Sequence, residues 1–325
     1  MLARPDKRPG TDTLARTVPG RRPRRSPNAK DGSLSARLLL AALWLFHWLP
    51  LGVQAAVGSA VGRLGWHLVA SRRKVALRNL ELCFPELGAG ERERLAREHF
   101  RWLGRSFLER GLLWYGSPAR LRRLIRVEGD VGLADRSDRP VMWLAPHFMA
   151  LDVAGASTQL FQGTKVISIY QRQSNVVLDG ALRGGRLRFG NAEIFSRDEA
   201  GKALMRAIRR GDAFFNLPDM DFGTRDAAFV PFFGVPTVTL LAPSRLARAL
   251  DMIVQPVVAE MLPRGRGYLV RYEPPWTDFP SDDPVADSAR MNRWIEGEIR
   301  RNPAQYLWVH RRFKTRPPGE PSLYR

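Results

Sequence analysis

A histidine and an aspartate stand five positions apart, directly after a short apolar run, and they are suited to proton transfer. The run covers residues 141–145, and His147 and Asp152 follow it. Histidine is the side chain that most often removes a proton from an alcohol near neutral pH, and a carboxylate on one ring nitrogen leaves the other free to accept it. The pattern predicts a general base, His147, oriented by Asp152. A core histidine beside an aspartate at a helix start is the competing interpretation.

Arginines gather after the next apolar run, residues 165–170. Arg172 and Asn175 follow this run closely, and Arg186 and Arg188 come after them. A guanidinium group matches the oxygens of phosphate and carboxylate, so this segment can bind an anionic substrate. A solvated helix face would contain the same residue types, and both interpretations stay open at this point.

A pair of carboxylates, Asp219 and Asp221, follows the apolar run at residues 213–217. Two carboxylates in a tight turn can act as acid and base, cap the turn or bind a metal. Because only two oxygen ligands stand close together, a metal is poorly supported. We therefore expect no metal site.

The three groups of polar residues require elements that bring them to one place. Leucines and aromatic residues at roughly helical spacing predict a helical region between about residues 95 and 112. Beyond residue 126, short apolar runs alternate with amphipathic segments, which predicts an α/β domain with a largely parallel central sheet. Ligands bind such sheets at the carboxyl ends of the strands, where one shared cleft would form. The apolar runs are residues 141–145, 165–170, 193–195, 213–217, 252–260 and 267–272, and the amphipathic segments are 149–160, 176–189 and 200–209.

The N-terminal part divides into two segments of opposite character. Residues 1–33 are rich in Arg, Pro, Gly and Ser, which predicts a disordered basic tail. Residues 34–62 are apolar and long enough to cross a hydrocarbon core of roughly 30 Å, although Pro50 interrupts them. We expect a membrane anchor helix here, either spanning the bilayer or lying in its interface, with a buried core helix as the alternative. Residues 63–325 would then form the catalytic domain.

Composition limits the possible functions. The formal charge of +20 attracts anionic lipid, acidic proteins or nucleic acid, and an apolar content of 44% is enough for a large core. The single cysteine, Cys83, excludes an internal disulfide and a cluster of cysteine metal ligands.

The chain resembles the lipid A biosynthesis acyltransferases of the lauroyl and myristoyl type, which complete the acylation of Kdo2-lipid IVA. The resemblance covers about residues 38–318. It rests on the apolar N-terminal segment, Arg78-Asn79-Leu80, Cys83-Phe84-Pro85-Glu86, His147-Phe148 with Asp152, Tyr170 with Arg172 and Asn175, and residues 185–188, 218–223 and 303–312.

The resemblance implies a role for each matching residue. His147 looks like the general base and Asp152 like its carboxylate partner. Arg186 looks like the arginine that holds substrate or polarises the thioester carbonyl, and Asp219 like an aspartate required in the same site. The chain departs from the pattern at position 152, where many lauroyl members carry Glu, at Gln171 and Gln173, where basic residues and Pro are often found, and in its basic tail.

By resemblance, the fold is the glycerolipid-acyltransferase type and the reaction is acyl transfer from acyl carrier protein to a hydroxyl of a lipid A precursor, Kdo2-lipid IVA or its acylated form. The expected partners are acidic acyl carrier protein, which presents the acyl group on phosphopantetheine, the anionic precursor and the bacterial inner membrane, with the catalytic domain on the cytoplasmic face. No cofactor and no nucleic acid are expected. Two alternatives remain: an enzyme of the same superfamily that acts on another membrane glycolipid or aminolipid, and a non-enzymatic basic protein that binds membranes or nucleic acid.

Overall fold

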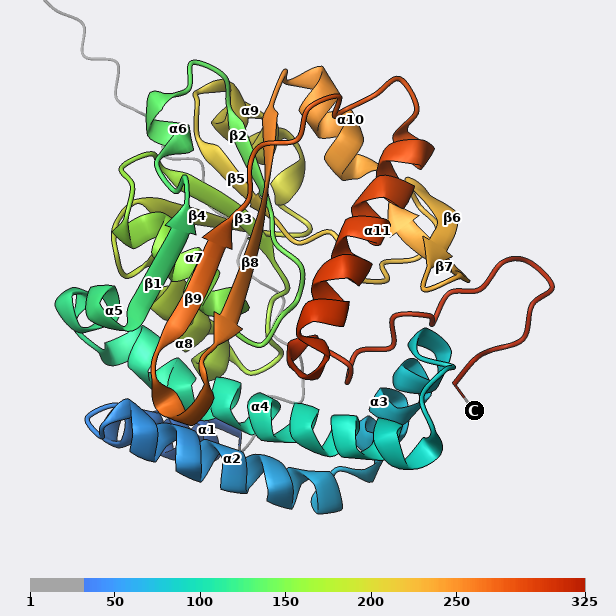
Figure 1. The fold of residues 1–325 in the computed structure, drawn as a ribbon. Coiled ribbons are helices and arrows are strands. Elements are labelled where there is room, and N and C mark those ends of the chain that lie inside the picture. The colour runs from blue at the N-terminus through green and yellow to red at the C-terminus, as the bar shows by residue number, and fades with distance from the viewer. Residues whose placement is uncertain (1–31, 325) are drawn as a thin grey trace, which may run out of the picture.

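A largely parallel sheet forms the centre of the molecule, whose structure is a computed structural model that describes residues 32–324 (Figure 1). Within these residues the strands of the seven-stranded sheet lie in the order β1-β9-β8-β2-β5-β3-β4, and all neighbours are parallel except β8 and β9. The strands are β1 (Ile125–Gly129), β2 (Val141–Leu144), β3 (Val166–Tyr170), β4 (Ala192–Ser196), β5 (Ala213–Asn216), β8 (Ile253–Met261) and β9 (Tyr268–Tyr272). The predicted α/β class is confirmed, while nearly all of the predicted disordered tail, residues 1–33, lies outside the described residues.

Alternate residues of β2 point to opposite faces of the sheet and enter two separate cores. Trp143 packs on the face covered by α7 (Leu151–Leu160), together with Val153 of that helix. Met142 packs on the other face with Ile208 of α9 (Ala200–Arg209) and Ile295 of α11 (Pro284–Arg301). Both faces are buried, as expected for a parallel sheet, so the strands read as continuous apolar runs.

The connections after β2, β3 and β5 carry the predicted site residues, and the first two lead into helices. Helix α7 follows β2, and α8 (Val176–Leu187) follows β3. An antiparallel hairpin of β6 (Ala227–Phe232) and β7 (Val235–Leu240) follows β5, and α10 (Ala242–Ala249) comes next. The chain ends in a segment that returns to the site, where Leu307 donates its backbone N–H to the His147 carbonyl (3.0 Å). Shorter elements complete the fold: α5 (Pro118–Leu124), α6 (Leu133–Arg136) and the 3-10 turns η1 (Pro263–Gly265) and η2 (Pro303–Gln305).

The apolar N-terminal segment forms two helices, whereas one continuous anchor helix was predicted at residues 34–62. Helix α1 (Gly32–Phe46) ends in a turn, and α2 (Leu51–Leu68) begins directly after Pro50. Proline fixes φ and lacks an N–H, which suits the start of a new helix. Within residues 32–324, no helix is both long and apolar enough to cross a membrane.

Helix α2 lies along α4 (Ala89–Tyr115) below the sheet (Figure 1). The two backbones approach so closely that a Cβ on Gly104 would lie 2.3 Å from the Gly58 carbonyl oxygen, and one on Gly62 would lie 2.0 Å from the Phe100 carbonyl oxygen. Helix α3 (Ala70–Cys83) joins them and carries the buried Cys83. The N-terminal helices are thus part of the folded domain.

Candidate active site

His147 lies just beyond the carboxyl end of β2, and its ring is held by Asp219. The Nδ1 atom lies 2.6 Å from Oδ1 of Asp219, and the His147 backbone N–H donates to Oδ2 of the same carboxylate at 2.9 Å. Strands β2 and β5 are parallel neighbours, so the residues beyond their carboxyl ends meet although they are 72 positions apart. Because Asp219 accepts the Nδ1 proton, Nε2 is the nitrogen that can accept one.

Asp152 does not hold the histidine ring, which corrects the predicted pairing. It lies in the first turn of α7, where its Oδ1 accepts from Nε (3.1 Å) and Nη2 (2.7 Å) of Arg186. Its Oδ2 lies 3.2 Å from Nη2 of Arg110 on α4. The five-residue spacing brings Asp152 into the same site, but two arginines rather than the imidazole take up its oxygens.

Both site carboxylates are held in the ionised form. Burial would raise the pKa of Asp219, but the charge and hydrogen bonds of His147 outweigh it and lower that pKa to about 2. Burial would likewise raise the pKa of Asp152, and the charges of Arg186 and Arg110 lower it to about 2. His310, close by, has its pKa lowered to about 4 by burial and then by His147, so it is neutral at pH 7. The site therefore combines two fixed negative charges with two arginines and a neutral neighbouring imidazole.

His147 and Asp152 line one cleft of about 570 Å³ at the carboxyl edge of the sheet. Its walls come from β3, β5, α4, α8 and the start of α10, as expected if the polar groups after successive strands share a cleft. Most of the lining is apolar, including Leu103, Phe215 and Leu246. A cleft with few polar groups on apolar walls fits a ligand that has a long hydrocarbon part.

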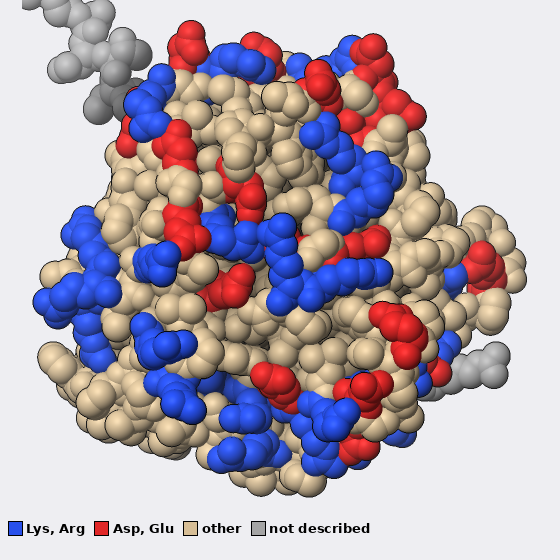
Figure 2. Space-filling view, viewed as in Figure 1, with Lys and Arg blue, Asp and Glu red and all other residues tan. Residues whose placement is uncertain are grey.

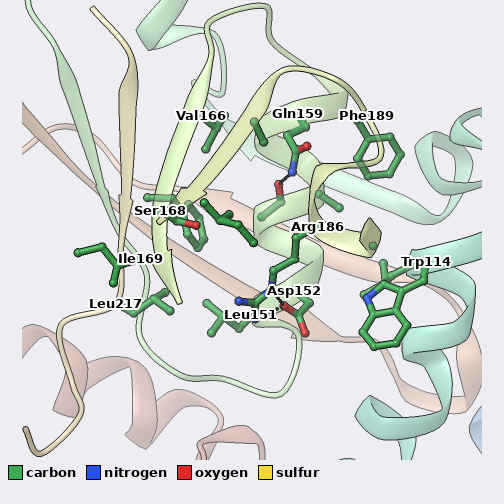
Figure 3. A pocket seen from close by; sticks show the side chains of 17 residues that line it. Trp114, Leu151, Asp152, Gln159, Val166, Ser168, Ile169, Arg186, Phe189 and Leu217 are labelled. Atoms are coloured by element: carbon green, nitrogen blue, oxygen red, sulfur yellow. Dashed lines mark hydrogen bonds and ion pairs between the residues drawn. The ribbon is translucent and has the colours of Figure 1, made fainter. Parts of the chain in front are cut away.

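A smaller cavity of about 60 Å³, whose lining is drawn in Figure 3, adjoins this cleft and shares Arg186 and Asp152 with it. The two hollows share part of their lining, namely Leu151, Asp152, Ile169, Arg186, Phe215 and Leu217. Trp114 of α4 and Phe189 stand at its wall, and Gln159 is a polar side chain among the apolar ones (Figure 3). The Trp114 ring packs on Gly185, where a Cβ would lie 2.2 Å from Trp114 Cδ1.

Arg172 and Asn175, predicted to bind substrate, have other partners here. Arg172 pairs with Glu199 at the surface. The Asn175 side chain caps α8 by accepting from the backbone N–H groups of Val177 (3.0 Å) and Leu178 (3.1 Å). The neighbours Gln171 and Gln173 line the cleft instead.

Arg188 and Asp221, also predicted to bind substrate, hold the scaffold together. Arg188 donates to backbone carbonyls at the end of α4, at Gly116 and at Leu113 (2.6 Å). Asp221 accepts from both the backbone N–H (2.7 Å) and the hydroxyl (2.8 Å) of Thr315 and so fixes the C-terminal segment beside the site. Neither residue is among those that line the cleft. Within residues 32–324, no group of three or more His, Cys, Asp or Glu residues is placed to hold a metal ion.

The sequence prediction missed Arg110, which completes the charge cluster. A signal for it exists, because Leu103, Ser106 and Arg110 repeat at three and four positions on the predicted helical region. All three line the cleft. An arginine on a helical face that also carries Leu103 and Ser106 can pair with a carboxylate inside the cleft, here Asp152.

Comparison with known proteins assigns this arrangement to a family. The sequence model of the bacterial lipid A biosynthesis acyltransferases matches residues 32–315. The chain belongs to the bacterial lipid A biosynthesis acyltransferase family. It is 36% identical to the lipid A biosynthesis palmitoleoyltransferase of Escherichia coli K12 over 88% of this chain and 92% of the relative. It is 33% identical to the lauroyltransferase of the same strain, over 88% and 93% of the two chains. The myristoyltransferase of that strain is 30% identical over 84% of this chain.

The family assignment confirms the resemblance predicted from the sequence, and the match includes α1 and α2 as well as the sheet. The named relatives transfer three different acyl groups. Membership in this acyltransferase family therefore supports acyl transfer in lipid A biosynthesis without selecting one acyl chain.

Proposed function

We propose that this family member transfers a fatty acyl group from the phosphopantetheine thioester of acyl carrier protein to a hydroxyl of a lipid A precursor, Kdo2-lipid IVA or its acylated form. The observation that carries the proposal is the ring of His147, oriented by buried Asp219 on the wall of a largely apolar cleft. Family membership supports the reaction class and the acceptor class.

In the proposed reaction, Nε2 of His147 takes the proton of the acceptor hydroxyl as its oxygen bonds to the thioester carbonyl carbon. The tetrahedral intermediate then expels the thiolate by breaking the C–S bond, and the imidazolium returns the proton to sulfur. Asp219 stays ionised and stabilises the imidazolium. The thioester is already activated, so the products are an ester and a free thiol.

Arg186 is the best-placed donor for the developing oxyanion. Its bonds to Asp152 use Nε and Nη2, which leaves Nη1 for another partner. The backbone N–H groups of Met149 and Leu151 at the start of α7 are already donated to Gln305 and Phe148 carbonyls. Asp152 and Arg110 would hold the guanidinium in place, so that its charge needs no rearrangement during the reaction.

The acyl chain would lie in the apolar part of the cleft, with its end toward the small cavity beside Trp114. The ends of such hollows limit the length of chain that fits. The outer faces of α1 and α2 expose large apolar side chains such as Leu38, Leu45 and Leu68, so they would contact the membrane. The reaction would take place at the cytoplasmic face of the inner membrane. The charge of +20 would favour acidic acyl carrier protein and the anionic precursor.

Substitution of the base tests the proposal. His147→Ala should lower transfer by about 10²- to 10⁴-fold, the usual value of general-base help. Product formation from purified acyl carrier protein thioester and precursor would be followed by mass spectrometry, with the exposed His67→Ala as control and circular dichroism to check the fold. Near-normal turnover of His147→Ala would contradict the role of His147 as the general base.

A deletion strain tests the acceptor. Its lipid A should lack one acyl chain, and the wild-type gene should restore it. If lipid A is intact in the deletion strain and another membrane glycolipid or aminolipid lacks an acyl chain, then that lipid is the acceptor and the proposed acceptor is wrong.

A further inference from the structure

A groove of about 550 Å³ lies between α2, α4 and the η1 turn, away from the cleft. We call it the arginine groove, because four arginines and a single glutamate line it. The charged members are Arg63, Arg101, Arg105, Arg264 and Glu98. Figure 2 shows Lys and Arg gathered along the lower part of the molecule, where α2 and α4 lie. Such an excess of positive charge in a concave surface favours an anionic ligand.

Arg105 is the buried member of the arginine groove, with a side chain only 3% exposed. Its Nε donates to Glu109 (2.7 Å) and its Nη1 to the Leu262 carbonyl (3.1 Å), while Trp102 lies under the guanidinium plane. Its Nη2 is buried and has no hydrogen-bond partner within residues 32–324. A buried guanidinium nitrogen is normally hydrogen-bonded, so the unpaired Nη2 is a donor that an oxygen entering the groove could satisfy.

The other three arginines are exposed and available. Within residues 32–324, the side chains of Arg63, Arg101 and Arg264 pair with no carboxylate. The turn that carries Arg264 is fixed against α2, because a Cβ on Gly265 would lie 2.6 Å from Gly52. The backbone on this side of the groove is therefore fixed, while the three exposed arginine side chains are free of carboxylate partners within the described residues.

An apolar row runs beside the arginine groove on the same helix. Gly52, Ala56, Ser59 and Arg63 line the groove at helical spacing. Another row of α2, with its own spacing of three and four residues, exposes Val53, Val57, Val61, Leu64 and Leu68. Adjacent basic and apolar rows match a molecule that has an anionic head and hydrocarbon tails.

We infer that the arginine groove binds the phosphate of an anionic phospholipid of the bilayer, with the lipid's acyl chains along the apolar row of α2. The inference goes beyond acyl transfer and rests only on the proposed contact of the chain with a membrane. Acidic acyl carrier protein is the rival occupant, and it would leave the exposed valines and leucines of the apolar row without a partner.

Vesicle binding of the purified full chain tests the site. Vesicles of phosphatidylcholine alone are compared with phosphatidylcholine and phosphatidylglycerol mixed at about four to one, because only the second carries negative charge. The double substitution Arg63→Gln, Arg101→Gln should weaken binding to the charged vesicles on the order of tenfold. It should leave binding to the neutral vesicles unchanged. The control Arg209→Gln, Arg293→Gln removes the same charge from exposed positions outside the groove and should change little.

Further arms separate the sources of the anion. If both double variants lose the same affinity for the charged vesicles, binding depends on the overall positive charge and not on the arginine groove, and the inference is wrong. Stabilisation of the wild type by inorganic phosphate alone, abolished in the groove variant, would overturn it in favour of a free-phosphate site. A raised KM for acyl carrier protein thioester in detergent, with unchanged vesicle binding, would overturn it in favour of the carrier protein. Normal turnover in detergent with weakened vesicle binding supports it and leaves the proposed reaction untouched.

Discussion

At the scale of single residues, Asp219 and Asp152 have the same charge but different partners. Asp219 is hydrogen-bonded to the ring of His147, whereas Asp152 is bound by Arg186 and Arg110. The sequence predicted that His147, Asp152, Arg186 and Asp219 lie near one another, but it paired His147 with the carboxylate that is nearer along the chain. The pairing depends on β2 and β5 being neighbours, and sequence spacing carries no information on strand order.

Asp219→Asn should lower turnover by about 10²- to 10⁴-fold with the fold intact. An amide can donate to Nδ1, which moves the imidazole proton to Nε2 and removes the base. Asp221→Asn is the matched control, because Asp221 is also buried but bonds Thr315 rather than the histidine. Asp221→Asn should lower the free energy of unfolding, because the contact with Thr315 is lost, and it should leave kcat nearly unchanged. Similar losses of kcat in both variants would contradict the orienting role of Asp219.

Buried His99 should make the free energy of unfolding fall at acidic pH. Burial lowers its pKa to about 4, and its Nδ1 lies 3.1 Å from the Ala304 carbonyl oxygen. The unfolded chain takes up this proton near the ordinary pKa of about 6.5, before the folded chain does, so stability falls as pH drops from about 6.5 to about 4. The loss is on the order of 3 kcal/mol. Urea unfolding across this range should show a shallower fall for His99→Gln and an unchanged fall for the exposed His67→Gln.

At the scale of elements, the parts of the fold that depend on local pattern were predictable. The apolar run at 141–145 is β2 (Val141–Leu144), and the amphipathic segment at 200–209 is α9 (Ala200–Arg209). The antiparallel pairing of β8 with β9 was not predicted, because an apolar run has the same appearance in either direction. Phe232, near the end of β6, is fully buried and belongs to the core.

The contact between Gly185 of α8 and Trp114 of α4 is expected to influence which acyl chains the enzyme accepts. Gly185→Ala would place a Cβ 2.2 Å from Trp114, so the indole that borders the small cavity must move. We expect a loss of roughly 1–3 kcal/mol in stability from overpacking, and a changed preference among donors of different chain length. Gly184→Ala is the control on the same helix, since nothing lies within 4 Å of its added Cβ. The preference is measured by competition between acyl carrier protein thioesters of different chain length, with the products identified by mass spectrometry. If both variants keep the wild-type preference, the small cavity does not control the choice of acyl chain.

At the scale of the whole molecule, the N-terminal helices both complete the fold and present an apolar surface. Helix α2 packs on α4 through Gly58 and Gly62, and Leu43 of α1 packs against Gly111 of α4, while the outer side of the two helices exposes large apolar side chains. Composition predicted an apolar N-terminal segment, but not that it would be divided at Pro50 and packed on α4. Deleting residues 34–62 would therefore damage the domain as well as any membrane contact.

Substitutions on the outer side separate these two roles. Leu38 and Leu68 are 62% and 71% exposed, so Leu38→Ser, Leu68→Ser should change the free energy of unfolding by less than about 0.5 kcal/mol each. Burial of a leucine is worth about 1.5–3 kcal/mol, so losing two should weaken membrane partitioning by roughly 10²- to 10⁴-fold. The control Val176→Ser, Val285→Ser alters exposed apolar residues at the starts of α8 and α11. If the double leucine variant still sediments with membranes after a salt wash as the control does, the outer side of α1 and α2 is not the membrane contact.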